Sequence, residues 1–429
     1  MKIIKYPAEP EWKKLQERFE LDVTTLFDTV KQILEDVRTA GDTAVLRYGG
    51  QFDKVVVEHL KVSQEEIEEA ESLLSEDLKE AIRVAQANIE KFHASQCMTE
   101  KKVETIPGVT CWQKAVAIEK VGLYIPGGTA PLFSTVLMLA VPARIAGCRE
   151  ILLCTPPNAE GKVHPAILYA AKVAGVNQIF KVGGVQAIAS MAYGTETIPK
   201  VYKIFGPGNQ YVTTAKQIVS LKDVAIDMPA GPSEVEIIAD ETANPAFIAW
   251  DFLSQAEHGA DSQSILLTTS EDLANRVIEE IEKQVQLLPR RELTSRSLLN
   301  SRIIILRNND EIISFTNQYA PEHLIINARY YEIIAGQVIN AGSVFLGAYT
   351  PESAGDYASG TNHTLPTKGY ARMYSGVNLD SFIKKITFQE ITKDGLRTLG
   401  PTIEVMAANE QLDAHKNAVT VRLTDLNNV

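Results

Sequence analysis

The feature that most constrains the fold of this chain is a repeated pattern in residues 118–231. Short runs rich in β-branched and aromatic residues are each followed by a glycine-containing turn and a helical stretch. The runs are residues 121–125, 151–155, 178–182 and 201–205. Spacings of roughly 25 to 30 residues are typical of βαβ units. The pattern therefore predicts a parallel sheet with helices on both faces.

A second series of such runs follows, separated by helical stretches such as residues 272–287. Its members are residues 235–239, 264–268, 303–306 and 343–346. Residues 12 to about 100 have a helical pattern, and a small tail with a β-like run at 384–389 follows residue 376. We expect an α/β fold of two Rossmann-like parallel-sheet domains, with an N-terminal helical segment and a small C-terminal tail domain. The expected limits are 1–120 plus 232–375 for the first domain, which includes the N-terminal helices, 121–231 for the second, and 376–429 for the tail.

Charge and cysteine usage narrow the range of partners. The net charge of −12 makes a nucleic-acid partner unexpected, because an acidic surface repels phosphate backbones. Residues 1–7 lack the apolar core of an export signal, and no apolar run approaches membrane-spanning length. The four cysteines show no CxxC spacing. We expect reduced thiols in a cytoplasmic protein that binds neither membrane nor nucleic acid.

Gln255 and His258 form the first candidate site. They lie three residues apart near the end of a predicted helix that starts at Pro245, continues to Glu257 and is stopped by Gly259. Residues i and i+3 share a helix face, so an amide oxygen and an imidazole nitrogen can point at one ion. A single pair of this kind proves little by itself.

The positions of the other histidines give the pair more weight. Of the seven histidines, four lie in dense polar or glycine-rich patches of the second half. Such loops expose side chains to a cleft, which favours a site over four separate structural roles. The four are His258, His323, His363 and His415.

Asp356 and His415 would complete a nitrogen and oxygen ligand set with Gln255 and His258. The absence of cysteine from the set argues against a closed structural zinc site and suits a catalytic or substrate-binding metal. Glutamine is an uncommon ligand, so spacing alone does not establish its place.

Glu322 and His323 form a second candidate pair, because just after Pro321 both side chains can reach one pocket. A carboxylate beside an imidazole offers two bases whose pKa values the environment can separate. The alternative is a solvated turn charge beside a histidine that caps a loop.

Three glycine-containing turns at residues 126–129, 183–186 and 206–209 follow strands and could approach a phosphate. The dinucleotide fingerprint is nevertheless absent, because Tyr211 stands where its third glycine belongs. Simple strand-to-helix connections and a nucleotide in a non-standard pose both stay open.

Together these motifs resemble the histidinol dehydrogenase family, in the family's order and over essentially the whole chain. The segments that carry the resemblance are residues 122–138, 206–209, 231–234, 254–259, 320–324, 355–363 and 414–418.

The resemblance implies oxidation of L-histidinol to L-histidine through the aldehyde with two NAD⁺, the last step of histidine biosynthesis. It implies one zinc ion per subunit, and a homodimer with exchanged C-terminal tails. His323 would take the alcohol proton, and Glu322 would activate the water that adds to the aldehyde. The implied zinc ligands, which also position substrate, are Gln255, His258, Asp356 and His415. Further substrate contacts would be Ser233, His323 and Glu410, and the NAD positions in the 121–231 domain would be Tyr124, Gln186 and Asn209.

Three alternatives stay open from the sequence. A paralogue of the same fold could oxidise another small alcohol. A zinc hydrolase could use Glu322 as the base for a metal-bound water. Oxidation through a cysteine thiohemiacetal is the third, although neither Cys111 nor Cys154 has an adjacent base in the sequence.

Overall fold

The structure, a computed structural model, describes residues 2–18, 23–127, 130–229 and 231–427. Contacts divide the chain into two compact units. The main unit contains Met1–Gln96 and Ile118–Phe382, and the tail unit contains Cys97–Ala117 and Ile383–Val429. Residues 97–117 were not expected to join the tail, and the two parallel sheets share one unit. The three-domain division with its limits stays a prediction.

The first sheet of the main unit has five parallel strands and contains all four runs of the first predicted series. Its order is β6-β5-β4-β7-β8. The strands are β4 (Lys120–Tyr124), β5 (Glu150–Thr155), β6 (Gln178–Lys181), β7 (Lys203–Phe205) and β8 (Ala225–Ile226). Each neighbouring pair is parallel, which confirms the βαβ interpretation.

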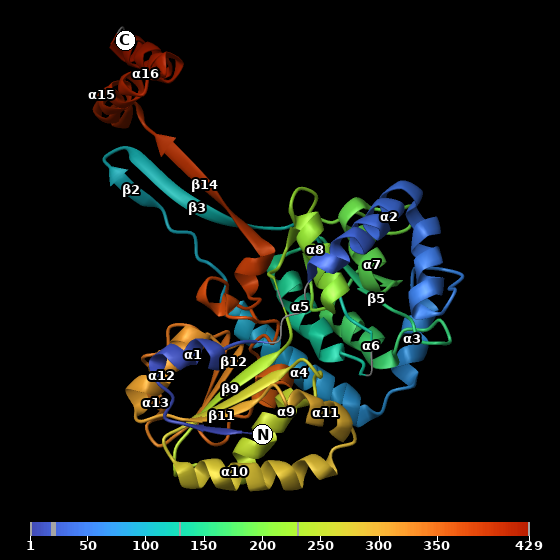
Figure 1. Cartoon of the computed structure of the whole chain (residues 1–429). Coiled ribbons are helices and arrows are strands. Elements are labelled where there is room, and N and C mark those ends of the chain that lie inside the picture. The colour runs from blue at the N-terminus through green and yellow to red at the C-terminus, as the bar shows by residue number, and fades with distance from the viewer. Residues whose placement is uncertain (1, 19–22, 128–129, 230, 428–429) are drawn as a thin grey trace. The chain divides into compact units, whose positions relative to one another are not determined.

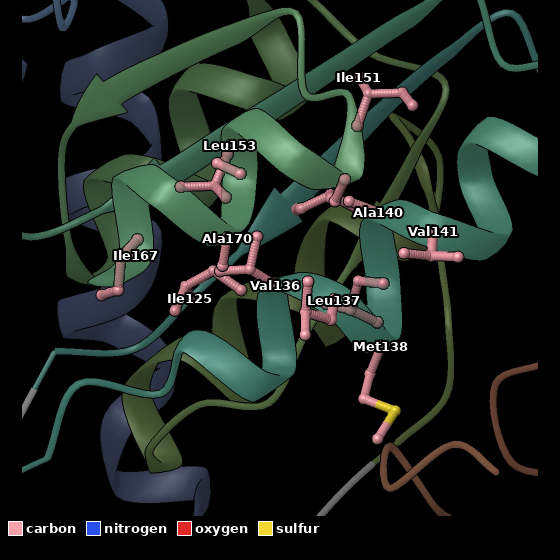
Figure 2. Packing of buried hydrophobic residues seen from close by; sticks show 14 of the residues in the cluster. Ile125, Val136, Leu137, Met138, Ala140, Val141, Ile151, Leu153, Ile167 and Ala170 are labelled. Atoms are coloured by element: carbon pink, nitrogen blue, oxygen red, sulfur yellow. The ribbon is translucent and has the colours of Figure 1, made fainter. Parts of the chain in front are cut away.

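Helices cover both faces of this sheet, because side chains along each strand alternate between the faces. Leu123 and Leu153 face α5 and α6, whereas Tyr124 and Leu152 face the opposite layer. Figure 2 shows the face that α5 and α6 cover, where side chains of α5 pack against Ile125 and Leu153. Every residue of α5 from Ser134 to Ala143 is buried, as expected of a helix that is covered around most of its circumference. The four connecting helices are α5 (Phe133–Ala146), α6 (Pro165–Ala174), α7 (Gly184–Tyr193) and α8 (Gln210–Ser220).

The N-terminal helices α2 (Phe27–Tyr48), α3 (Gln64–Ser72) and α4 (Glu76–Ala94) pack against this sheet's helices, although the sequence placed them with the other α/β domain. Helix α2 packs on α7 and α8, α3 on α6, and α4 on α5. The apolar face of α2 around Ile33 merges with the core that contains Ile188. Helical periodicity identifies such an apolar face but does not identify the surface that the face covers. Of the N-terminal elements, only β1 (Ile3–Lys5) and α1 (Glu9–Leu15) join the second sheet.

The second sheet has six parallel strands in the order β1-β11-β10-β9-β12-β13. It contains the four runs of the second predicted series and two strands that were not predicted, β1 and β12. The strands are β1 (Ile3–Lys5), β9 (Glu234–Ala239), β10 (Gln263–Thr268), β11 (Arg302–Ile305), β12 (His323–Asn327) and β13 (Ser343–Leu346). Strand β12 lies between β9 and β13, with His323 paired to Val235 and Ser343.

Both faces of the second sheet are also covered. Ile237 packs toward α9 and α10, and the next residue, Ile238, packs toward Trp12 of α1 and Phe315 of α12. In the first sheet β5 and β6 lie on one side of β4, and β7 and β8 lie on the other. In the second sheet β10 and β11 lie on one side of β9, and β12 and β13 lie on the other. The strand order therefore reverses beside β4 and beside β9. The helices are α9 (Pro245–Ala256), α10 (Glu271–Gln284), α11 (Arg291–Ser297), α12 (Asn309–Tyr319), α13 (Tyr331–Ala335) and α14 (Glu352–Tyr357).

The tail unit is a three-stranded antiparallel sheet followed by two helices (Figure 1). Its strands are β2 (Val103–Ile106), β3 (Val109–Ala117) and β14 (Ile383–Ile391), and its helices are α15 (Lys393–Asn409) and α16 (Asp413–Asn427). The β-like run at 384–389 lies within β14, and Phe388 stacks on Trp112 with ring centroids 5.4 Å apart. Throughout the described parts of the chain, every helix is too short or too polar to span a bilayer.

Candidate active site

The amino ends of β9 and β12 lie side by side, so the residues that enter these two strands meet. Ser233 precedes β9 and Glu322 precedes β12. The Glu322 carboxylate accepts hydrogen bonds of 2.9 Å from the Ser233 hydroxyl and 2.9 Å from the backbone N–H of Glu234. Only 4% of Glu322 is exposed. The carboxylate therefore has a fixed place inside the protein.

His323, the first residue of β12, lies among three carboxylates. Its Nδ1 is 3.7 Å from Oε2 of Glu322 and 3.5 Å from Oε1 of Glu352. Its Nε2 is 3.7 Å from Oδ1 of Asp356. Burial by itself lowers the pKa of this imidazole, but the three carboxylates raise the pKa well above 6.5. Burial raises the pKa of Glu322 to about 7, although His323 opposes the shift.

Helix α14 supplies two of these carboxylates from one face, because Glu352 and Asp356 are four residues apart. Glu352 is buried, and neither carboxylate oxygen has a hydrogen-bond partner among the described residues. Burial raises the pKa of Glu352 to about 8. Sequence reasoning missed Glu352. The signal that could have found it was its i, i+4 spacing from Asp356, which was a candidate already.

Gln255 and His258 come from the end of α9. The predicted helix ends at Ala256, earlier than expected, because its last turn tightens: the backbone N–H of His258 donates to the Gln255 carbonyl at 3.2 Å. The Gln255 side chain is fully buried, and neither its amide oxygen nor its amide nitrogen has a partner in the described chain. Such an unpaired buried amide is costly, and a bound ligand would satisfy it.

The donor atoms at this site fit a divalent cation. One ligand atom each from His258, Glu352 and Asp356 lies within 4.8 Å of the other two. Imidazole nitrogen with carboxylate oxygens, and no thiolate, suits an open zinc site. The structure thus brings together His258 and Asp356 of the expected ligand set and places the unpaired amide of Gln255 one turn from His258.

The remaining candidates divide between the two units. His363 has a local structural contact on each nitrogen: Nδ1 lies 2.8 Å from the Asp356 carbonyl and Nε2 lies 3.0 Å from the Thr135 hydroxyl. Glu410 follows the end of α15 and His415 lies in α16, both in the tail unit and both exposed. The site roles of Glu410 and His415 stay predictions.

A cavity of about 790 Å³ opens beside the first sheet and is lined by Tyr124, Gln186 and Asn209. Tyr124 ends β4, and Asn209 follows the neighbouring strand β7 and caps α8. This is the point where the strand order reverses, which is where open α/β sheets bind ligands. Of the turn at 126–129, Gly128 and Thr129 lie outside the described residues.

The polar groups of this cavity fit a dinucleotide. Gln186 is fully buried, and neither its amide oxygen nor its amide nitrogen has a hydrogen-bond partner in the described chain. The buried hydroxyl of Thr155 also has no partner there. The Tyr124 hydroxyl accepts a 3.1 Å hydrogen bond from the backbone N–H of Gly184. Burial raises the pKa of Tyr124 to about 12, so the phenol keeps its proton as a donor. The Asn209 side-chain oxygen caps α8, which leaves its NH₂ group to donate.

Comparison with known proteins gives one consistent result. The sequence model of the histidinol dehydrogenase family matches residues 16–423. A histidinol dehydrogenase of Bacteroides thetaiotaomicron is 67% identical over 426 residues, which cover 99% of this chain and 100% of that one. The chloroplastic enzyme of Arabidopsis thaliana is 54% identical over 415 residues, covering 96% and 89%. A crystal structure of histidinol dehydrogenase from Elizabethkingia anophelis superposes with a TM-score of 0.98 at 55% identity, covering 100% and 99%. The chain is therefore an oxidoreductase that belongs to the histidinol dehydrogenase family.

Proposed function

We propose that this chain oxidises L-histidinol to L-histidine through the aldehyde, using two NAD⁺ in turn, as the last step of histidine biosynthesis. Membership of the family supports the substrate and the reaction. The observation that carries the proposal is the buried Glu322–His323 pair, which lies beside two further carboxylates of α14. Two oxidations with a water addition between them need two proton acceptors, and this pair supplies both.

The proposal includes one zinc ion per subunit, held by Gln255, His258, Asp356 and the His415 of an exchanged tail. When bound, zinc would anchor the imidazole and amine of histidinol and offset the nearby carboxylates, which lets His323 lose its proton near neutral pH. The unpaired Gln255 amide and the clustered donor atoms of His258 and Asp356 support this assignment.

Each residue of the pair has its own role in the chemistry. His323 accepts the alcohol proton as the carbon-bound hydrogen leaves as hydride. Glu322 then takes a proton from the water that adds to the aldehyde, and Ser233 and the backbone N–H of Glu234 hold its carboxylate in place. A pKa of about 7 suits a base that works at neutral pH. General-base help of this kind contributes roughly 10²–10⁴ in rate.

NAD⁺, which accepts the hydride of each oxidation, would bind in the cavity at Tyr124, Gln186 and Asn209. The unpaired amide of Gln186 and the protonated Tyr124 phenol support this position. Further substrate contacts would come from Ser233 and from Glu410 of the exchanged tail.

The proposal also includes a cytoplasmic homodimer with exchanged tails. The tail unit exposes large apolar side chains such as Met406 and Val421, and exposed apolar groups of this kind favour an interface. All four cysteines are free thiols, as is usual in a reducing compartment. Burial raises the pKa of Cys154 to about 12. Its nucleophilic thiolate is therefore scarce, which disfavours a thiohemiacetal route.

The test is a metal analysis of the purified protein combined with NADH formation from L-histidinol and from a panel of other small alcohols. We expect one zinc ion per chain, a clear preference for L-histidinol, loss of turnover after chelation and recovery with zinc. Preferred turnover of another alcohol would instead indicate a paralogous dehydrogenase. Hydrolysis without NAD⁺ would indicate a zinc hydrolase.

A further inference from the structure

Asp53 lines the dinucleotide cavity from a turn that none of the sequence motifs includes. Helix α2 is followed by a π-helical turn, Gly49–Asp53. The next residue, Lys54, has φ of 58°, a left-handed backbone conformation that residues other than glycine rarely adopt. Oδ1 of Asp53 lies 3.3 Å from the position that a Cβ would take at Gly183. The backbone therefore holds this carboxylate against the turn that begins α7.

The Asp53 carboxylate makes no hydrogen bond or ion pair with any residue that the structure describes. Burial raises the pKa of Asp53, because the ionised carboxylate is only partly solvated. Hydrogen-bond donors of a bound ligand could replace the missing water. Ribose hydroxyls are donors of the kind it needs. The adjacent Phe52 stacks on Tyr48 at 5.5 Å and stays 49% exposed, which leaves aromatic surface for a planar base.

The described wall of the cavity offers no compensating positive charge. Neither lysine nor arginine is among the described residues that line it. His164 lines it too, but Nδ1 of His164 accepts a hydrogen bond from the backbone N–H of Ala166 at 3.2 Å and so carries no proton. Burial also lowers the pKa of His164. A phosphate on ribose normally needs an arginine or a lysine, so the cavity wall disfavours one.

The two walls of the cavity indicate the orientation of the dinucleotide. Pro131, on one wall, leads into α5, whose Thr135 contacts His363 beside Asp356. That wall leads toward the Glu322–His323 pair and is the place for the nicotinamide. Asp53 follows α2, which packs on the opposite face of the sheet from α5. The adenosine half therefore falls on the Asp53 side.

We propose that Asp53 accepts hydrogen bonds from the adenosine ribose hydroxyls and thereby selects NAD⁺ over NADP⁺. This inference rests on the proposed NAD⁺ dependence and names the residue that sets cofactor specificity. A 2′-phosphate would remove one donor and bring further negative charge against the carboxylate. The described residues that line the cavity include no lysine or arginine to balance that charge, and the nearby Lys181 already pairs with Glu66 at 2.6 Å.

The test compares Asp53→Asn, which keeps the side-chain size and removes the charge, with Glu58→Gln. Glu58 is exposed, lies five residues away and does not line the cavity, so it controls for a general loss of negative charge. NAD⁺ and NADP⁺ are titrated separately into the zinc-loaded enzyme by calorimetry, and kcat/KM is measured with each. We expect the preference for NAD⁺ to fall at least about tenfold in Asp53→Asn, which corresponds to one lost discriminating contact. Glu58→Gln should keep the parental ratio.

An Asp53→Asn enzyme that binds both dinucleotides more weakly but keeps the parental ratio would overturn the role of Asp53 and leave NAD⁺ dependence intact. An equal change of ratio in Glu58→Gln would also overturn it, because long-range charge would then be the cause. If the parent enzyme binds neither dinucleotide, both the inference and the proposed function fail.

Discussion

The Glu322 carboxylate lies 3.7 Å from Nδ1 of His323, and both side chains are almost fully buried. Neighbours in a regular strand point to opposite faces, but Glu322 lies just before β12 and turns back to the N–H of Glu234 on β9. Burial raises the pKa of Glu322 and by itself lowers the pKa of His323, and the attraction between the two groups opposes this effect of burial in both. Two adjacent residues can therefore hold two different proton-transfer roles in one buried cluster.

Glu322→Gln should slow the oxidation of the aldehyde far more than that of the alcohol, because only the second step needs a base for water. A loss of roughly 10²–10⁴ is expected for that step. His323→Ala should nearly abolish both steps. The two steps are followed separately by NADH formation from L-histidinol and from L-histidinal, with the exposed Glu332→Gln as control. Equal residual rates for both steps in Glu322→Gln would contradict the division of roles.

Glu352→Gln should lower zinc affinity or activity by about 10- to 100-fold, the usual cost of losing a carboxylate beside a metal site. Glu352 is buried and lies close to His258 and Asp356. Zinc content and kcat are measured at rising zinc concentration. Recovery of kcat with excess zinc would show that Glu352 acts on metal binding. No recovery would show that it acts on the imidazole of His323 instead. Parental zinc content and parental kcat together would show that Glu352 has neither role.

Exchange of tails predicts complementation between two defective chains. A chain with His415→Ala is co-expressed with a chain that carries Glu322→Gln and His323→Ala. In a mixed dimer with exchanged tails, one of the two sites has all its parts, so about a quarter of parental activity is expected from random pairing. Chains that use their own tails would give no active site in any combination, and co-expression would then restore nothing.

The buried Glu236 should make stability depend on pH. Burial raises its pKa to about 8, whereas the carboxyl group titrates near 4.3 in the unfolded chain. The folded protein binds this proton more tightly than the unfolded chain does. The stabilisation that protonated Glu236 contributes to the free energy of unfolding is therefore fully present below about pH 4.3 and is lost as pH rises through 8. Glu236→Gln, which stays neutral, should gain about 2–4 kcal/mol over the parent between pH 5 and pH 9. Denaturant unfolding across this range checks it, with exposed Glu279→Gln as control. A pH-independent difference would contradict the assignment.

Much of the fold could be predicted because both sheets consist of strands whose apolar runs are separated by helical stretches. Strand β12 was missed because its run, Leu324–Ile326, follows Pro321 and two polar residues, which were interpreted as a loop. The hairpin of β2 and β3 was missed because many of its side chains are exposed or half-buried, so neither strand shows a clear apolar run.

The candidate site could be predicted in part, because some of its residues lie in polar motifs that differ clearly from apolar core sequence. Gln255, His258 and Asp356 lie in polar motifs that stand out from core sequence. Glu352 and Asp53 do not: one follows a proline in ordinary helix-initiating sequence, and the other ends a π turn after a long helix. Only the folded chain shows that Asp53 is partly buried beside a cavity and that Glu352 is buried in a cluster of donor atoms.

The most direct test of the central claim is the number of NADH molecules formed for each L-histidinol consumed by the zinc-loaded enzyme, with the product identified by chromatography. A buried pair with two proton-transfer roles predicts two NADH and free L-histidine, with no aldehyde accumulating. One NADH per substrate with release of the aldehyde, or no NADH at all, would contradict the account.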